Sequence, residues 1–353
     1  MMLSSGDFAV YLAESNIFNY IGPRFGDLTI GANRERMVDA WLKSKLFRAT
    51  FLNAQQIRPK LIEKARNHGA FLRIVMEEMA AEQHAHRWAD NSPEELLHMR
   101  RIKEEIPDAK FIHMIRDGRD VSLSLDARPY PWVRPFPWDR KDSVIVTGVV
   151  WEWMVRQGRK EGRQLGSDYL EVHFEDLQFD PVKTLAEISE FIEHDLDHQH
   201  IQRTGIGSVR DPNTSFKGEG TSPVGRWRKK LTAEKLALFE SAVGATLESV
   251  GYSLATDVAA RRKHALAAAR LRRFYHQYLA GKFWFKNSWI GRRYLGPLSG
   301  EQIDNIVIAV DPAKQPAEAV PNAAKTKSNL SAAPFIPPDS NQPRPSAMPR
   351  SRS

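Results

Sequence analysis

The sequence predicts an α/β fold of three layers, in which helices flank a central parallel sheet. Two short apolar runs, KFIHMI at 110–115 and YLEVHF at 169–174, have the length and composition of buried strands. Segments with helical periodicity precede, separate and follow these runs. Strands that alternate with helices pair in parallel and are covered by those helices, so this order of elements indicates the fold class.

The predicted helices are defined by apolar residues that recur at helical spacing. They occupy residues 34–52, 92–106, 142–165, 181–192 and 232–250. The second helix starts with a capping signature, in which Ser92 is the N-cap, Pro93 lies in the first turn and Glu95 takes the capping-box position.

From about Asp311 onward the chain is rich in Pro, Ala, Ser, Asn and Lys. Such a composition buries too little apolar surface to offset the entropy lost on ordering, which predicts a disordered tail. We therefore divide the chain into an α/β domain at 1–255, a basic helical appendage at 256–300 and the tail at 310–353.

The composition excludes several classes of protein. With 353 residues, 42% of them hydrophobic, the chain is long enough for a sizeable core. No apolar run reaches the ~18 residues of a membrane-spanning helix. The first residues include Asp7 and Glu14 and lack a cationic start, so we expect no signal peptide. The absence of cysteine excludes disulfides and thiolate chemistry, and a cytoplasmic location fits it.

The formal net charge of +8 comes from one segment. Residues 258–300 hold ten Lys and Arg and no acid, whereas the rest of the chain has 41 basic and 43 acidic residues. Because the body is nearly neutral, we expect no nucleic-acid partner, and an explanation of the charge must concern that segment.

The stretch KFIHMIRDGRDVSLSL, residues 110–125, combines groups that bind phosphate. Arg116 ends the first predicted strand, at the carboxyl edge where open α/β sheets bind ligands. Asp117 or Asp120 would cap the next helix, and Ser124 lies within its opening turns. A guanidinium, hydroxyls and a helix N-terminus predict a site for a phosphate dianion. The alternative is that Arg116 pairs with Asp120 and the serines only pack or cap.

The same stretch resembles the 3′-phosphate-binding motif of sulfotransferases that use 3′-phosphoadenosine 5′-phosphosulfate (PAPS). In that motif an Arg ends the strand and a Ser eight residues later opens the helix. The likeness continues in the family's order through WADNSP, YLEVHFEDLQFDP and GRWRKKLT, and covers roughly residues 5 to 252. The resemblance implies a P-loop-like sulfotransferase fold, PAPS as co-substrate without a metal, and Arg116 and Ser124 as ligands of the ribose 3′-phosphate.

Several features of that family are missing or altered. The first strand and the loop rich in Gly, Ser and Thr that holds the 5′-phosphosulfate have no counterpart before Gly6. Asn91 and Gly225 stand where some members have a lysine and a serine that stabilise the transferring sulfuryl group. Asp7 is the carboxylate nearest to the family's general base, which we leave unassigned. Lys217, in FKG, partly resembles another phosphate-binding loop, and its alternative is a solvated loop lysine.

Other ionisable residues have structural interpretations. His113 lies inside the first strand, on the face opposite the arginine of the phosphate site, and should pack in the core. His84 and His86 are two residues apart on a helix, so they point to different faces and should not share a metal. Glu175 and Asp176 should cap the turn into the helix that follows the second strand.

These observations predict a sulfotransferase that moves a sulfuryl group from PAPS to a hydroxyl or amine of a small molecule or glycan. Such a transfer depends mainly on positioning and electrostatics, as phosphoryl transfer does. The alternative is a catalytically silent relative that binds the nucleotide or a glycan.

Residues 258–300 interleave eight aromatic rings with the ten cations. Rings at the level of lipid headgroups and cations on anionic lipid would make this segment a peripheral membrane contact. Stacking rings and positive charge would also suit a polyanionic or sugar acceptor. A third interpretation is a helix pair packed on the body, with its aromatic residues buried and its arginines solvated.

Overall fold

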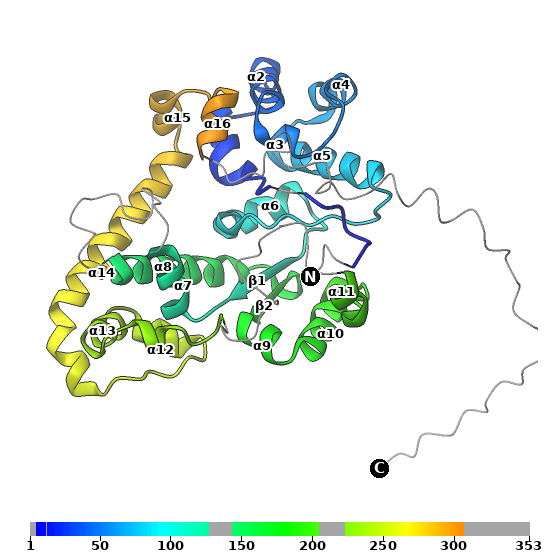
Figure 1. Ribbon diagram of the computed structural model, residues 1–353. Helices are drawn as coiled ribbons and strands as arrows, with labels where there is room; N and C mark the ends of the chain where they lie inside the picture. The colour runs from blue at the N-terminus through cyan, green and yellow to red at the C-terminus, as the bar shows by residue number, and fades with distance from the viewer. Residues whose placement is uncertain (1–4, 12, 127–142, 205–222, 307–353) are drawn as a thin grey trace, which may run out of the picture. The chain divides into compact units, whose positions relative to one another are not determined.

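The computed structural model describes residues 5–11, 13–126, 143–204 and 223–306 (Figure 1). These residues form mainly helices together with one small parallel sheet, which agrees with the α/β class. Within the described residues the sheet has two strands, β1 (Phe111–Ile115) and β2 (Tyr169–His173), which are the two that the sequence predicts. The other apolar segments have helical periodicity and fold as helices, as the sequence predicts.

The two strands pair in parallel, as their sequences predict. Phe111 lies opposite Tyr169, and the register continues to Ile115 opposite His173. The chain between them contains α7 (Gly118–Asp126), α8 (Ser143–Gly162) and η5 (Gly166–Asp168), and parallel strands require such a long crossover. One further parallel bridge joins Phe8 to Arg87.

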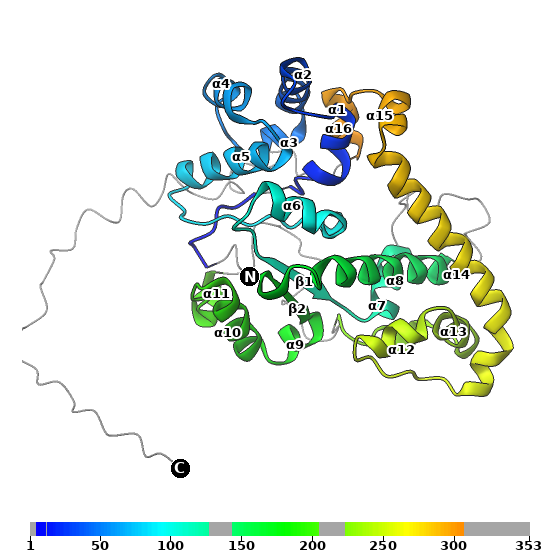
Figure 2. The same ribbon diagram turned by 180° about the vertical axis from the view of Figure 1, so that it is seen from behind.

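A first group of helices surrounds one apolar core, in which Trp41, Phe18 and Phe71 are among the largest fully buried side chains. Both views show α2, α4 and α5 gathered together (Figures 1 and 2). The group comprises η2 (Ile17–Ile21), α1 (Gly22–Phe25), α2 (Gly31–Leu42), α3 (Lys45–Arg48), α4 (Ala54–Lys64), α5 (His68–Glu82), η3 (Pro93–His98), α6 (Met99–Glu105) and α16 (Gly300–Ile306).

The helices that follow β2 form a second group, and one of them packs against α8, which precedes β2. α8 and α13 pack against each other, and Phe239 of α13 lies directly on Gly148 of α8, where a Cβ atom would clash. The helices after β2 are α9 (Phe174–Phe179), α10 (Pro181–Ile192), α11 (His198–Thr204), α12 (Trp227–Lys230), α13 (Ala233–Ser249), α14 (Val258–Asn287) and α15 (Trp289–Leu295).

The middle of α14 is attached to α8 and α13. Ala268 and Tyr275 are buried in the core that these helices share. Glu152 of α8, also buried, accepts hydrogen bonds from Arg272 at 2.7 and 2.9 Å and from His276 at 3.0 Å. This part of the basic segment therefore belongs to the packed fold, whereas the predicted tail lies outside the described residues.

Ser92 is the N-cap of the second predicted helix and Pro93 lies in its first turn, as predicted, but no side-chain capping bond forms, and the helix is divided into η3 and α6. The Ser92 hydroxyl accepts from the backbone N–H of Asn16 at 3.2 Å and donates to Asp90 at 2.9 Å. Glu95 accepts from the backbone N–H of Phe18 at 2.9 Å. Both side chains thus bind the segment around η2, because that segment packs on the start of η3.

Candidate functional site

Arg116 follows the last residue of β1, at the carboxyl edge of the sheet. Its guanidinium donates to the carbonyl oxygen of Pro223 and lies over the ring of Phe174, 4.6 Å from the centroid. Burial lowers the pKa of Arg116, and the nearby carboxylate of Asp120 opposes that effect. Its Nε is buried and has no hydrogen-bond partner among the described residues. A half-buried guanidinium with an unused donor is well suited to bind an anion.

The side of β1 that carries Arg116 is partly open to solvent. Side chains alternate along a strand, so Met114 shares the side of Arg116, whereas His113 and Ile115 take the other. Met114 is 41% exposed, and His113 and Ile115 are buried. The prediction for His113 is confirmed: its ring hydrogen-bonds to the hydroxyl of Tyr169 at 2.6 Å, and burial lowers its pKa to about 4.

Asp117, rather than Asp120, caps α7. Its carboxylate accepts from the backbone N–H of Arg119 at 2.9 Å and from the guanidinium of the same residue at 2.8 and 3.0 Å. Arg119 also donates to Glu240 at 2.8 Å and lies over the ring of Trp227, 3.9 Å from the centroid. This buried network fixes the start of α7 against α13.

Asp120 joins the first turn of α7 to the segment before α12. Its carboxylate oxygens accept from the backbone N–H groups of Gly225 at 2.6 Å and Trp227 at 3.0 Å. Burial raises the pKa of Asp120, and these two hydrogen bonds counteract that effect. Gly225 has φ of 76°, a left-handed conformation that glycine adopts without strain. The carboxylate therefore binds this turn, which differs from the alternative of a hydrogen-bonded pair with Arg116.

The turn held by Asp120 places Arg226 beside the predicted phosphate site. The Arg226 guanidinium donates to the hydroxyl of Ser124 at 2.6 Å. Its positive charge also contributes to the lowered pKa of Arg116, so the two arginines are near each other. Two guanidinium groups, a hydroxyl and the opening turns of α7 thus converge. A phosphate or sulfate dianion bound there would relieve the repulsion between the arginines.

The phosphate site predicted from the sequence contains Arg116 and Ser124 but lacks Arg226. The arginine is visible in GRWRKKLT, yet nothing local shows that Asp120 binds this segment, which lies 105 residues further along the chain. Lys217, the third predicted ligand, lies outside the described residues, and Asn91 is exposed.

The model of the sulfotransferase family matches residues 20–198, just over half of the chain. The chain belongs to the sulfotransferase family. The matched range contains both strands, Arg116 and Ser124, and ends before Lys217 and Arg226.

Among solved structures, this family member is similar to the sulfotransferase domain of the olefin synthase of Synechococcus PCC 7002. The two are 19% identical, with a TM-score of 0.41, and the match covers 78% of this chain and 89% of that one. The search of curated proteins found no significant match.

Glu175, one of two carboxylates predicted to cap α9, has other partners in this sulfotransferase-family chain. Glu175 accepts from the backbone N–H of Asp117 at 3.0 Å and from the hydroxyl of Tyr252 at 2.6 Å, so it ties the end of β1 to the segment after α13. α9 begins without a side-chain cap, and the cap predicted for Glu175 and Asp176 is wrong. Asp7 lies 3.2 Å from the Nε2 atom of His194.

His84 and His86 were predicted to lie on a helix, and this prediction is wrong. His84 and His86 follow the end of α5, and His84 has a φ of 55°, so neither lies on a helix. Within the part of the chain that the structure describes, no group of three or more His, Asp or Glu residues could hold a metal ion.

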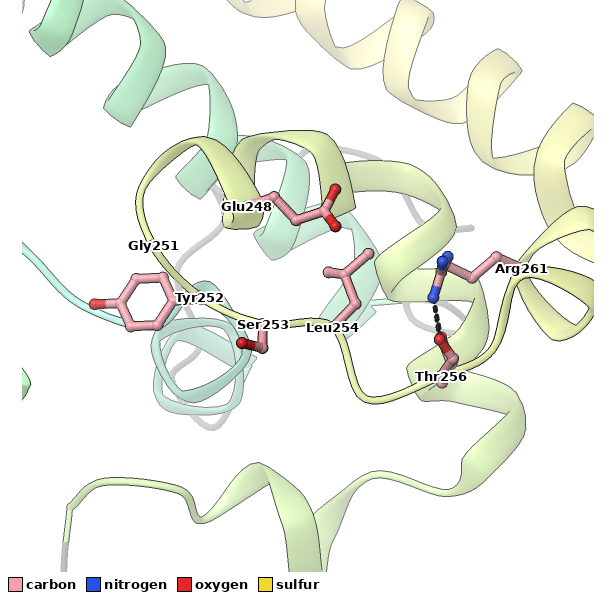
Figure 3. A pocket seen from close by; sticks show the side chains of 7 residues that line it. All are labelled: Glu248, Gly251, Tyr252, Ser253, Leu254, Thr256 and Arg261. Atoms are coloured by element: carbon pink, nitrogen blue, oxygen red, sulfur yellow. Dashed lines mark hydrogen bonds between the residues drawn. The ribbon is translucent and has the colours of Figure 1, made fainter.

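A surface pocket of about 420 Å³ lies between the end of α13 and the start of α14 (Figure 3). Within it, Arg261 is hydrogen-bonded to Thr256. Neither arginine of the predicted phosphate site lines this pocket, although Tyr252, which does, also binds Glu175. The lining residues are Glu248, Gly251, Tyr252, Ser253, Leu254, Thr256 and Arg261.

Proposed function

We propose that this protein transfers a sulfuryl group from PAPS to a hydroxyl or amine of a small-molecule or glycan acceptor. The observation that carries the proposal is the convergence of Arg116, Ser124 and Arg226 in a chain that belongs to the sulfotransferase family. These groups suit the 3′-phosphate, which distinguishes PAPS from other adenosine nucleotides. Lys217 is a further proposed ligand. We place the reaction in the cytoplasm, because a chain without cysteine does not depend on an oxidising compartment.

In the proposed reaction the acceptor atom attacks sulfur while the bond from sulfur to the 5′-phosphate oxygen breaks, and the acceptor proton passes to a base. Arg116 and Arg226 would bind the nucleotide at its 3′ side, away from the reacting sulfur. Their contribution is therefore affinity and orientation. Asp120 acts through Arg226, because its bonds to Gly225 and Trp227 hold the turn on which Arg226 lies.

Calorimetry with two nucleotides tests this assignment. Adenosine 3′,5′-bisphosphate should bind more tightly than adenosine 5′-phosphate. Arg116→Ala and Arg226→Ala should each remove most of that preference, because a lost hydrogen bond to a charged group costs about 1.5–3 kcal/mol, or about ten- to a hundredfold in affinity. Lys229→Ala, which removes an exposed cation of α12, is the matched control and should leave the preference unchanged. Equal affinity of the unmutated protein for both nucleotides would contradict the proposal.

A further inference from the structure

We propose that α14 and α15 form a surface that binds anionic membranes peripherally. Large aromatic side chains on these two helices are exposed to solvent. Trp284, Trp289 and Tyr294 are 61%, 68% and 81% exposed. Trp and Tyr concentrate at the level of lipid headgroups, because each has a large apolar ring and one polar group that can remain hydrated.

Cations lie on the same two helices. Arg262, Lys263, Arg270 and Arg273 of α14 and Arg293 of α15 are exposed. The segment from residue 258 to residue 300 contains no Asp or Glu that could neutralise them. Unscreened like charges repel one another, and an anionic surface would convert that repulsion into attraction.

The exposed groups occupy one side of α14. Lys263, Leu266, Arg270, Arg273 and Trp284 are spaced by three, four, three and eleven residues, which keeps them on one helical face. The opposite face carries the residues that bind α8 and α13, among them the buried Tyr275 and Ala268. Figures 1 and 2 show α14 running along the outside of α8 and α13. Because the opposite face of α14 packs on α8 and α13, the face that carries the cations and Trp284 is directed to solvent.

The shape of this surface favours a membrane over a sugar or another polyanion. The pocket described for this chain shares only Arg261 with the segment and includes none of the exposed rings. The rings are exposed on two helices and not gathered in a pocket, which suits an extended, flat partner. Among the described residues, no helix is long and apolar enough to span a bilayer. Attraction of the cations to anionic lipid and insertion of the rings at the headgroup level would both contribute to binding at such a surface.

Co-sedimentation of the full chain with vesicles tests the proposal. Vesicles that contain phosphatidylglycerol should bind the protein, and vesicles of phosphatidylcholine alone should bind it much more weakly. Arg270→Gln/Arg273→Gln should reduce binding to the anionic vesicles about thirtyfold, since each cation near such a surface contributes about fivefold. Trp284→Ser/Trp289→Ser should remove the part of the binding that persists in high salt, because salt screens charges and not rings.

Matched variants on other helices complete the design. Lys64→Gln/Arg66→Gln removes two exposed cations at the end of α4, and Phe179→Ser removes a 73% exposed ring from α9. Both should bind vesicles as the unmutated protein does, and far-UV circular dichroism should show that every variant is folded. Losses as large in these controls would overturn the proposal. So would equal binding to neutral vesicles, or retention on an acidic-glycan column without vesicle binding, which would identify a polyanion as the partner.

Discussion

Two buried glutamates next to the same long helix have pKa values shifted in opposite directions. Glu152 of α8 contacts the middle of α14 and is 1% exposed, and Glu95 of η3 lies near its C-terminal end and is 7% exposed. Burial opposes ionisation of Glu152, but hydrogen bonds from His276, Arg272 and Thr246 outweigh it and lower its pKa to about 2. For Glu95, burial dominates and Asp90 adds repulsion, so its pKa rises well above the usual range.

The difference lies in the donors that reach each carboxylate. Glu152 accepts four hydrogen bonds, three of them from the guanidinium and imidazole of α14. Glu95 accepts one from a backbone N–H, and its Oε2 has no partner among the described residues. The nearest cation, Lys286, donates to Asn19 instead, and burial lowers its pKa to about 8. Burial alone therefore does not set the charge of an acid, whereas charged donors in contact with it do.

The largest effect is expected when one of the residues that donate hydrogen bonds to Glu152 is replaced. Arg272→Met should lower the free energy of unfolding by about 3 kcal/mol, because it leaves a buried carboxylate with only part of its compensation. Urea denaturation would measure the loss. Arg273→Met, at the neighbouring exposed position, should change stability by less than about 0.5 kcal/mol. The double variant Glu152→Leu/Arg272→Leu should recover much of the loss, since it leaves no unpaired charge. A small effect of Arg272→Met would mean that His276 and Thr246 suffice to hold Glu152.

A second test uses pH to isolate the charge of Glu152. Its native pKa, about 2, lies below the ordinary value of 4.5, so the ionised form stabilises the fold above pH 4.5. That contribution is lost as the pH falls from 4.5 towards 2. Glu152→Gln should therefore cost about 3 kcal/mol at pH 7, and the difference from the unmutated protein should shrink through that window. Urea titrations at several pH values would show it, and a pH-independent difference would assign the effect to packing.

Elements whose signals are local were predictable from the sequence. The predicted strands at 110–115 and 169–174 are β1 and β2 to within one residue at each end, and the helix at 181–192 is α10. Alternation and helical spacing are properties of neighbouring residues, so no distant contact is needed to read them. Within the described residues the sheet consists of these two strands.

Contacts across long sequence separations could not be predicted. Arg116 and Ser124 are close in sequence, and one motif contains both. Arg226 reaches them because Asp120 binds a turn 105 residues further along the chain. Glu95 likewise matched a local capping pattern, but its partner is the backbone of Phe18, 77 residues earlier. A local pattern shows which side chains can bind, and the packing decides what they bind.

The last test, and the one that probes the comparison most directly, is Glu95→Gln. Glutamine keeps an acceptor for the backbone N–H of Phe18 and does not titrate. Because the native pKa of Glu95 is raised, the folded state keeps its proton at pH values where the unfolded chain has lost it. Linkage then requires the stability of the unmutated protein to fall as the pH rises from the ordinary value of 4.5 to the native pKa. The variant escapes that loss, so its advantage should grow with pH across this window and then level off.

Urea titrations of both proteins from pH 4 upward would measure this difference. Glu187→Gln, at an exposed position of α10, is the matched control and should shift stability by the same small amount at every pH. If Glu95→Gln also gave a constant shift, Glu95 would be ionised in the native protein. Lys286 would then compensate it as Arg272 compensates Glu152, and the two ends of the comparison would no longer differ. A rising difference would instead show that Glu95 is protonated in the native protein, whereas Glu152 is ionised.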